Sequence, residues 1–110
     1  MTSPVKIHIY SVYAKPGTAL ATLKKELSAV LEDLSGDIVI MGDFNCVGSK
    51  REQLDKHMER HGLQQMIHVP TTNSNTTLDL VFTNLCGIEL GTLETYYSYH
   101  KAVFLKLSLD

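Results

Sequence analysis

The stretch that decides the fold of this chain is Ile38-Val39-Ile40-Met41-Gly42-Asp43-Phe44-Asn45. Its first half is a continuous apolar run, which is typical of a strand buried on both faces. Its second half places a carboxylate and an amide, Asp43 and Asn45, at the end of that strand. Side chains two residues apart point to one side of an extended backbone. The pattern fits either a polar site that polarises water or holds a metal, or an Asp/Asn turn after a buried strand.

The residues before this stretch predict one strand and one helix. Residues 5–13 alternate with period two and are rich in β-branched side chains, as in a strand. Lys15-Pro16-Gly17 ends the strand, and Thr18 is expected to cap a helix. The apolar side chains of that helix recur at helical spacing over residues 20–34, and Gly36 ends it.

The residues after it predict a second helix and further strands. Ser49-Lys50-Arg51-Glu52 has the form of a capping box, so a helix is expected from about Lys50 to His61. Residues 63–69 fit a short strand or a helical turn, and residues 70–77 fit a loop. Strands are expected at 78–83, 88–97 and 101–109. This order predicts one α/β (α+β) domain over residues 1–110, with a mixed sheet and helices on one face.

Composition and charge exclude several classes of protein. With 44% hydrophobic and 20% charged residues, the chain has the composition of a globular domain. A net charge of -2 argues against a grip on nucleic acid over the whole surface. No secretory signal and no membrane-spanning run is visible, so we expect a cytoplasmic or nuclear protein with no membrane partner. Cys46 and Cys86 have no metal or disulfide pattern and are expected to be buried thiols.

Two histidines, His57 and His61, lie four residues apart in the second predicted helix. That spacing can chelate a metal ion. No third ligand is marked beside them, so a solvated helix face is the prediction.

Four blocks in a fixed order resemble a known family. They are Ser11-Val12-Tyr13-Ala14-Lys15-Pro16, the stretch from Ile38 to Asn45, Thr77-Leu78-Asp79-Leu80-Val81-Phe82-Thr83, and Ser98-Tyr99-His100-Lys101-Ala102-Val103. Together they resemble the C-terminal half of the endonuclease/exonuclease/phosphatase superfamily, and most closely the endonuclease domains of non-LTR retrotransposons and related mobile elements. The resemblance implies one half of a four-layer α/β/β/α sandwich. It also implies magnesium-dependent hydrolysis of a phosphodiester, with DNA or RNA as the substrate.

The resemblance implies a role for each matching residue. Asp43 would activate the attacking water and bind the metal, and Asn45 would contact the scissile phosphate and steady Asp43. Tyr13 would lie against the phosphate. His100 would approach the phosphate, with Asp79 orienting its ring, since a carboxylate on one imidazole nitrogen fixes the tautomer. Taken alone, Asp79 also fits a strand-end carboxylate and His100 a surface histidine.

Two departures from the family pattern predict impaired catalysis. Tyr99 stands where the closing Ser-Asp-His motif has a metal-binding aspartate, and a neutral phenol is a poor magnesium ligand. The asparagine and glutamate that the family's N-terminal half supplies are not among these residues. An isolated half would also expose a sheet face, so we expect a homodimer or a protein partner to cover it. Three functions stay open: a phosphodiesterase, a non-catalytic binding or regulatory module, and a plain interaction domain.

Overall fold

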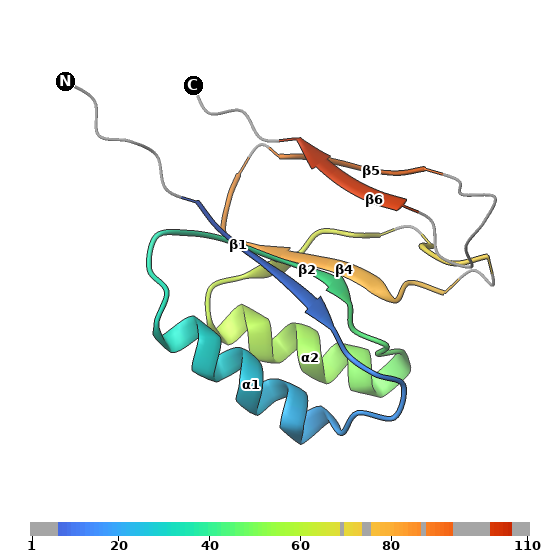
Figure 1. Ribbon diagram of the computed structural model, residues 1–110, viewed down its shortest axis with the longest axis horizontal. Coiled ribbons are helices and arrows are strands. Elements are labelled where there is room, and N and C mark those ends of the chain that lie inside the picture. Colours follow the sequence, from blue (N-terminus) through green and yellow to red (C-terminus); the bar gives the residue numbers. More distant parts are fainter. Residues whose placement is uncertain (1–6, 69, 74–75, 87, 94–101, 107–110) are drawn as a thin grey trace.

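The computed structural model (Figure 1) describes residues 7–68, 70–73, 76–86, 88–93 and 102–106 of the chain. The expected order of a strand, a helix, a strand, a helix and then strands is confirmed in these residues. The elements are β1 (Ile7–Tyr13), α1 (Leu20–Glu32), β2 (Asp37–Asp43), α2 (Gly48–Arg60), β3 (Gln64–Gln65), β4 (Asp79–Thr83), β5 (Glu89–Leu93) and β6 (Ala102–Lys106). The outer parts of three predicted strands, at residues 5–6, 94–97, 101 and 107–109, lie outside the described residues.

Four strands form a mixed sheet in the order β1-β2-β4-β3. β1 and β2 are parallel, with Ile7 opposite Asp37. Two adjacent parallel strands need a long crossover, and α1 provides it. β4 pairs antiparallel with β2, and the two residues of β3 extend the far side of β4. β2 is therefore an inner strand, as its apolar run predicted, and β1 is an edge strand.

β5 and β6 form a separate antiparallel pair instead of extending the main sheet. Figure 1 shows α1 and α2 on one side of the main sheet and the β5–β6 pair on the other. The predicted mixed sheet with helices on one face is confirmed, and the fold is consistent with half of an α/β sandwich. The second, small sheet was not predicted, because the turn after β4 resembles the turn of an ordinary hairpin.

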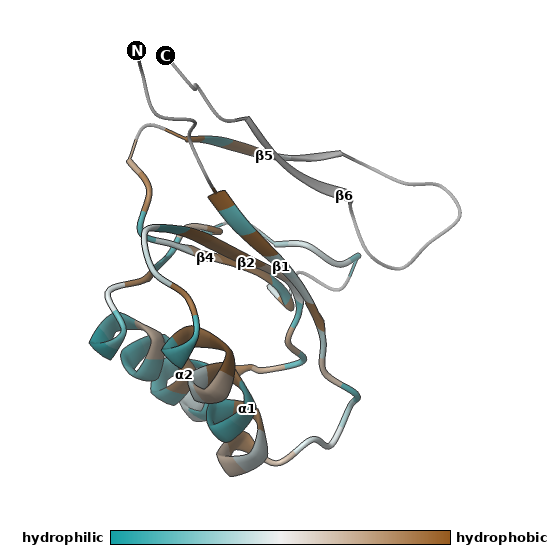
Figure 2. Ribbon diagram, turned by 60° about the vertical axis from the view of Figure 1, so that its left-hand side comes forward, coloured by the Kyte–Doolittle hydropathy of each residue, from teal (hydrophilic) through white to brown (hydrophobic). Residues whose placement is uncertain are grey.

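The helices pack on the sheet through one apolar face each. α1 buries leucines at every fourth position, and α2 buries Leu54 and Met58. Phe82 of β4 and Phe44, the residue after β2, belong to the same core cluster, with ring centroids 5.3 Å apart in an edge-to-face arrangement. In Figure 2 the strands in the middle are hydrophobic, while the helices are hydrophilic on their outer sides.

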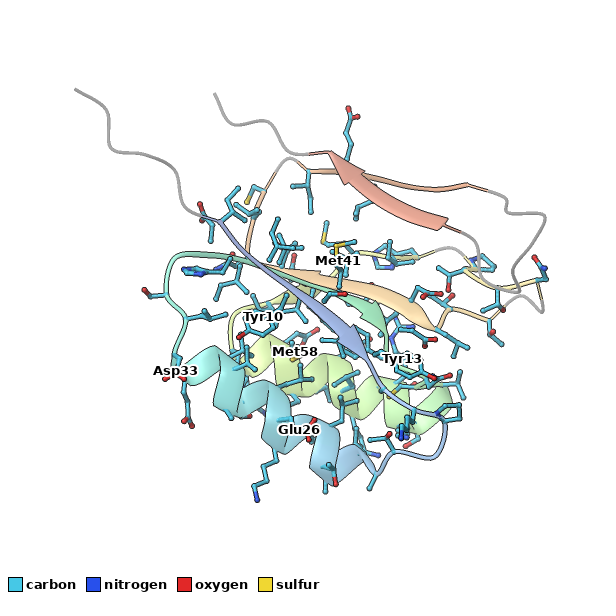
Figure 3. All side chains as sticks on the ribbon, viewed as in Figure 1. Tyr10, Tyr13, Glu26, Asp33, Met41 and Met58 are labelled. Atoms are coloured by element: carbon cyan, nitrogen blue, oxygen red, sulfur yellow. The ribbon has the colours of Figure 1, made fainter. Side chains whose placement is uncertain are left out.

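The other face of the sheet has its own apolar cluster. Val39, Val81 and Ile67 are buried there, and Leu90 of β5 packs against them. Figure 3 shows Met41 on this side of the sheet and Met58 between the sheet and the helices. The small sheet and the segment around Ile67 thus cover the middle of this face.

Among the residues whose side chains the structure describes, the exposed large apolar side chains on this face lie on the edge strand β1. The exposed fractions are 59% for Ile9 and 69% for Tyr13. Both side chains share a face with Ile7, which packs against the buried cluster. An edge strand with exposed apolar side chains is a feature that soluble proteins usually cover.

Both predicted helix caps are wrong. The N-cap of α1 is Ala19, and the hydroxyl of Thr18 instead donates to the carbonyl oxygen of Lys15 at 2.7 Å. The N-cap of α2 is Val47, which places Ser49 inside the helix, where its hydroxyl accepts from Gln53. Neither N-cap makes a side-chain hydrogen bond to its helix.

The two cysteines differ in burial. Cys46 is buried as predicted, and its thiol donates to the carbonyl oxygen of Phe44 at 3.2 Å. Burial raises the pKa of this thiol, which keeps it protonated. Cys86 is exposed in the turn after β4, so the prediction of a second buried thiol is wrong. None of the helices in the described segments has the length and apolarity needed to cross a membrane.

Candidate functional site

The residues singled out in the sequence meet at one end of the main sheet. Tyr13 ends β1, Asp43 ends β2 and Asp79 begins β4. In the pairing of these strands Asp43 is opposite Tyr13 on one side and opposite Asp79 on the other. Three residues that are far apart in the sequence therefore form one row across three adjacent strands.

The three side chains of this row share one face of the sheet. Side chains of paired residues lie on the same face, and alternate residues along a strand return to that face. Val39 and Val81 mark the face turned away from the helices, and they are separated from Asp43 and Asp79 by an even number of residues. Figure 3 shows Tyr13 at the end of β1. The row therefore lies on the side of the sheet that carries β5 and β6.

Gly42 allows β1 and β2 to approach closely just before the row. A Cβ atom on Gly42 would lie 1.9 Å from the carbonyl oxygen of Val12, its partner in the pairing. The φ angle of Gly42 is 148°, which also favours glycine. The site thus depends on a glycine for the close approach of β1 and β2.

Asn45 is held in a strained but specific turn after β2. Its φ angle is 46°, a left-handed value that asparagine tolerates better than most residues. Its backbone N–H donates to Oδ1 of Asp43 at 3.1 Å, and its side-chain amide donates to the carbonyl oxygen of Ala14 at 2.6 Å. Asn45 therefore steadies Asp43 through the backbone and ties the end of β2 to the end of β1.

Thr71 fixes the start of β4 from the preceding loop. It is fully buried, and its hydroxyl oxygen accepts hydrogen bonds from the backbone N–H groups of Leu78 and Asp79, both at 3.0 Å. The backbone N–H of Thr71 in turn donates to the carbonyl oxygen of Thr76 at 2.9 Å. The loop thus sets where β4 begins, and with it the place of Asp79 in the row.

Two basic residues that follow Asn45 in the sequence interact with other groups of the protein. Lys50 donates to the carbonyl oxygen of Thr18 at 2.5 Å, and Arg51 forms an ion pair with Asp55 at 3.1 Å. Both cations act on the Cys46 thiol, where they oppose the effect of burial on its pKa. They bring positive charge to the turn that follows Asp43 and Asn45.

The donor atoms of the row fit part of a magnesium site. Asp43 and Asp79 face each other across an antiparallel pair, where Cβ atoms are about 4.5–5.5 Å apart and like charges repel. A dication between them would relieve that repulsion. Magnesium prefers hard oxygen ligands and is often held by one or two carboxylates, with water and substrate phosphates as the other ligands. Among the described residues there is no group of three or more His, Cys, Asp or Glu side chains placed to hold a metal ion.

Two residues of the predicted site, His100 and Tyr99, lie outside the described residues. The structure brings together Tyr13, Asp43 and Asp79, with Asn45 next to them. Two contributors were missed from the sequence: the hydroxyl of Thr71 as an acceptor for the Asp79 N–H, and the carbonyl oxygen of Ala14 as an acceptor for Asn45. The sequence gives a weak indication for Thr71, because Pro70-Thr71 lies shortly before the third of the four resembling blocks. A main-chain carbonyl carries none.

One protein-family model matches most of the chain. The family is described as endonuclease-reverse transcriptase, and the match covers residues 7–104. This range includes every residue of the row, Asn45, Thr71 and the segment with Tyr99 and His100. No curated protein matches the chain.

Proposed function

Because the chain belongs to the endonuclease-reverse transcriptase family over residues 7–104, we propose that the row of Tyr13, Asp43 and Asp79 binds a phosphodiester group of DNA or RNA. The family match supports an endonuclease-like domain of the retrotransposon type. The observation that carries the proposal is the strand register, which lines up the three side chains on one face. A row of hydroxyl and carboxylate groups at the ends of adjacent strands is an arrangement suited to a phosphate and its counterion.

Each side chain of the site has a chemical role in this proposal. The carboxylate of Asp43, oriented by the N–H of Asn45, accepts a proton from the attacking water. The Asn45 amide uses one N–H on Ala14, and its second N–H is the donor for a phosphate oxygen. The hydroxyl of Tyr13 donates to another phosphate oxygen, and Asp79 would orient the ring of His100, as the family resemblance implies.

Magnesium would be held through Asp43, with Asp79 as the neighbouring carboxylate. When bound, it neutralises charge on the phosphate. Tyr99 replaces a carboxylate in the family's closing motif, and a neutral phenol is a weak ligand for a hard dication. We therefore propose that the chain binds the phosphodiester but hydrolyses it slowly.

A plasmid-nicking assay with magnesium tests the hydrolytic part of this proposal. Tyr99→Asp restores a carboxylate ligand, so we expect magnesium-dependent nicking to rise at least tenfold over that of the unmodified chain. Adding Asp43→Asn to Tyr99→Asp removes the group that accepts the water proton, so nicking should fall back by on the order of 100-fold.

The matched control is Asp37→Asn in the same Tyr99→Asp background. Asp37 lies on the same strand and the same face as Asp43, at the opposite end of β2. Nicking should survive this change. Equal nicking by the Asp43→Asn and Asp37→Asn proteins, or no magnesium-dependent nicking after Tyr99→Asp, would contradict the proposal.

The exposure of β1 favours a second function, a non-catalytic module that pairs through its sheet face with a second copy or a protein partner. Ile9 and Tyr13 are among the most exposed large apolar side chains of the described residues. Tyr13 belongs to both readings, because it lies in the row and on the exposed strand. A binding module would keep its association when Asp43 is replaced, whereas phosphodiester hydrolysis would be lost.

A further inference from the structure

A second group of polar side chains joins the two helices, on the side of the sheet opposite the row. His57 and His61 lie in and just after the last turn of α2, and Ser28 lies on α1. Nε2 of His57 is 2.9 Å from the hydroxyl oxygen of Ser28, and Nε2 of His61 is 3.3 Å from the same atom. The two rings meet edge to face, with centroids 5.1 Å apart. Two imidazole nitrogens thus point at one position beside α1.

This arrangement differs from the solvated helix face predicted for these histidines. His57 is partly buried between the helices, although His61 is exposed. Burial lowers the pKa of His57, and the neighbouring His61 and Lys24 lower it further. His57 is therefore in the neutral form at neutral pH, which is the form that binds metal ions.

We propose that His57 and His61 form a binding site for Zn²⁺ or a similar late first-row divalent ion, at the position that the hydroxyl of Ser28 now occupies between their Nε2 atoms. Histidines at positions i and i+4 of a helix lie on the same face and can share one ion. Imidazole is a preferred ligand of this class of ions and a poor one for magnesium. The site is thus distinct in chemistry from the carboxylate row.

The geometry requires only a small adjustment. Zinc binds imidazole nitrogen at about 2.0–2.1 Å, so each ring must close on the common point by on the order of 1 Å. Rotation of the two side chains can provide this movement. The ion would displace the hydroxyl of Ser28 from this position, and water would complete its coordination, which gives an open site with two protein ligands.

The charges around the pair limit its affinity. Lys24 and Arg60 contribute positive charge at His57, and that charge opposes a dication as well as a proton. A backbone hydrogen bond with Lys24 acts in the other direction and favours the protonated ring. Lys24→Gln should therefore tighten zinc binding, because it removes a like charge and keeps the backbone contact.

Calorimetric titration of Zn²⁺ into the metal-free full chain at neutral pH tests the proposal. We expect one ion per chain with a dissociation constant below about 100 µM. His57→Gln and His61→Gln should each weaken binding at least tenfold, since each removes one of two nitrogen ligands. His68→Gln is the matched control, because His68 is exposed on another segment and should leave the affinity unchanged.

Thermal unfolding provides a second readout that does not depend on activity. A ligand that binds only the folded chain raises the melting temperature. Zinc should therefore raise the melting temperature of the unmodified chain and of His68→Gln, and at the same zinc concentration should raise that of His61→Gln by much less. His61 is exposed and makes the longer of the two contacts, so its replacement is compatible with a folded chain even if His57→Gln is not. Equal zinc affinity for the unmodified chain and His61→Gln would overturn the proposal. So would the absence of one-to-one binding with a dissociation constant below about 100 µM.

Discussion

Gly42 places Asp43 through a backbone contact that no other residue can make. Replacing it with alanine puts a Cβ atom 1.9 Å from the carbonyl oxygen of Val12, in a backbone conformation that L-residues avoid. We expect Gly42→Ala to lower the free energy of unfolding by on the order of 3 kcal/mol or more, because β1 and β2 must separate. Urea unfolding measures this change.

Gly36→Ala is the matched control for that substitution. Gly36 also has a positive φ, of 84°, but a Cβ atom there meets nothing within 4 Å. Its replacement carries conformational strain alone, about 1 kcal/mol. If the two variants lost equal stability, the close approach of Gly42 to Val12 would be unimportant.

His57 gives the stability of the chain a dependence on pH. Its folded-state pKa lies below the ordinary value of 6.5, through burial first and then through His61, Lys24 and Arg60. The unfolded chain therefore takes up this proton at higher pH than the folded chain does. The stabilising contribution is present above pH 6.5 and is lost as the pH falls from there through the folded-state pKa.

The check is the free energy of unfolding measured by urea at several pH values on both sides of that range. His57→Gln should flatten the dependence, while His68→Gln should leave it in place. A pH dependence that is the same in both variants would show that another group is responsible.

At the scale of a residue, the sequence predicts which side chains matter better than it predicts their contacts. Asp43 and Asn45 stand out as a carboxylate and an amide at the end of an apolar run, whereas the role of Asp79 follows only from the resemblance of its block to the family. The bond from Asn45 to the carbonyl oxygen of Ala14 crosses 31 residues, and nothing in the pattern indicates it. The hydroxyl of Thr71 accepts hydrogen bonds from the N–H groups of Leu78 and Asp79 across a loop. These bonds depend on the conformation of the loop, which the sequence does not indicate.

At the scale of an element, the uncapped start of α2 is a place where stability can be gained. Val47 has the extended backbone of an N-cap and is 56% exposed, but it offers no hydrogen-bond acceptor. We expect Val47→Ser to raise the free energy of unfolding by about 1 kcal/mol, because a serine hydroxyl accepts a free N–H of the first turn.

Val47→Ala separates the effect of the new cap on stability from the effect of removing the valine side chain. Alanine removes the same exposed side chain without supplying an acceptor, so it should not stabilise the chain. Thermal or urea unfolding of the two variants measures the difference. Equal stability of the serine and alanine variants would contradict the role of the cap.

The elements themselves were predictable because their apolar side chains repeat with clear periods. Leucines of α1 recur every four residues, and the strand β2 is a continuous apolar run. The helix starts were misplaced because Thr18 and Ser49 have the right chemistry for a cap, while the chain enters each helix one residue after Thr18 and two residues before Ser49. Backbone angles decide that position, and Gly48 there has a φ of 59°, a left-handed value that favours glycine.

At the scale of the whole molecule, the exposed side of β1 predicts association. Ile9→Glu places a charge on this side and should weaken any self-association seen by sedimentation velocity, because burying an unpaired carboxylate is costly. Val47→Glu is the control, since Val47 is similarly exposed, at 56% against 59%, but lies at the start of α2. Equal sedimentation of the two variants at all concentrations would argue against an interface on β1.

The division into two sheets could not be predicted from the sequence. A single mixed sheet satisfied every strand pattern, and a turn of a few residues separates β4 from β5 in either arrangement. The main chain leaves the first sheet there because β4 is already paired on both sides, by β2 and by β3. Side-chain patterns record which face of a strand is buried, and they carry little information on which strand is its neighbour.

The pairings of β2 also say something about how the molecule forms. Ile7 pairs with Asp37 across thirty residues, and Val39 pairs with Thr83 across forty-four. Pairing between such distant residues slows folding, because the chain loses the entropy of closing a long loop before the strand contacts can stabilise it. We expect the helices to form early and the carboxylate row to be assembled late, when both neighbours of β2 have arrived. A chain that is still folding would thus form its helices before the row of Tyr13, Asp43 and Asp79 can bind a ligand.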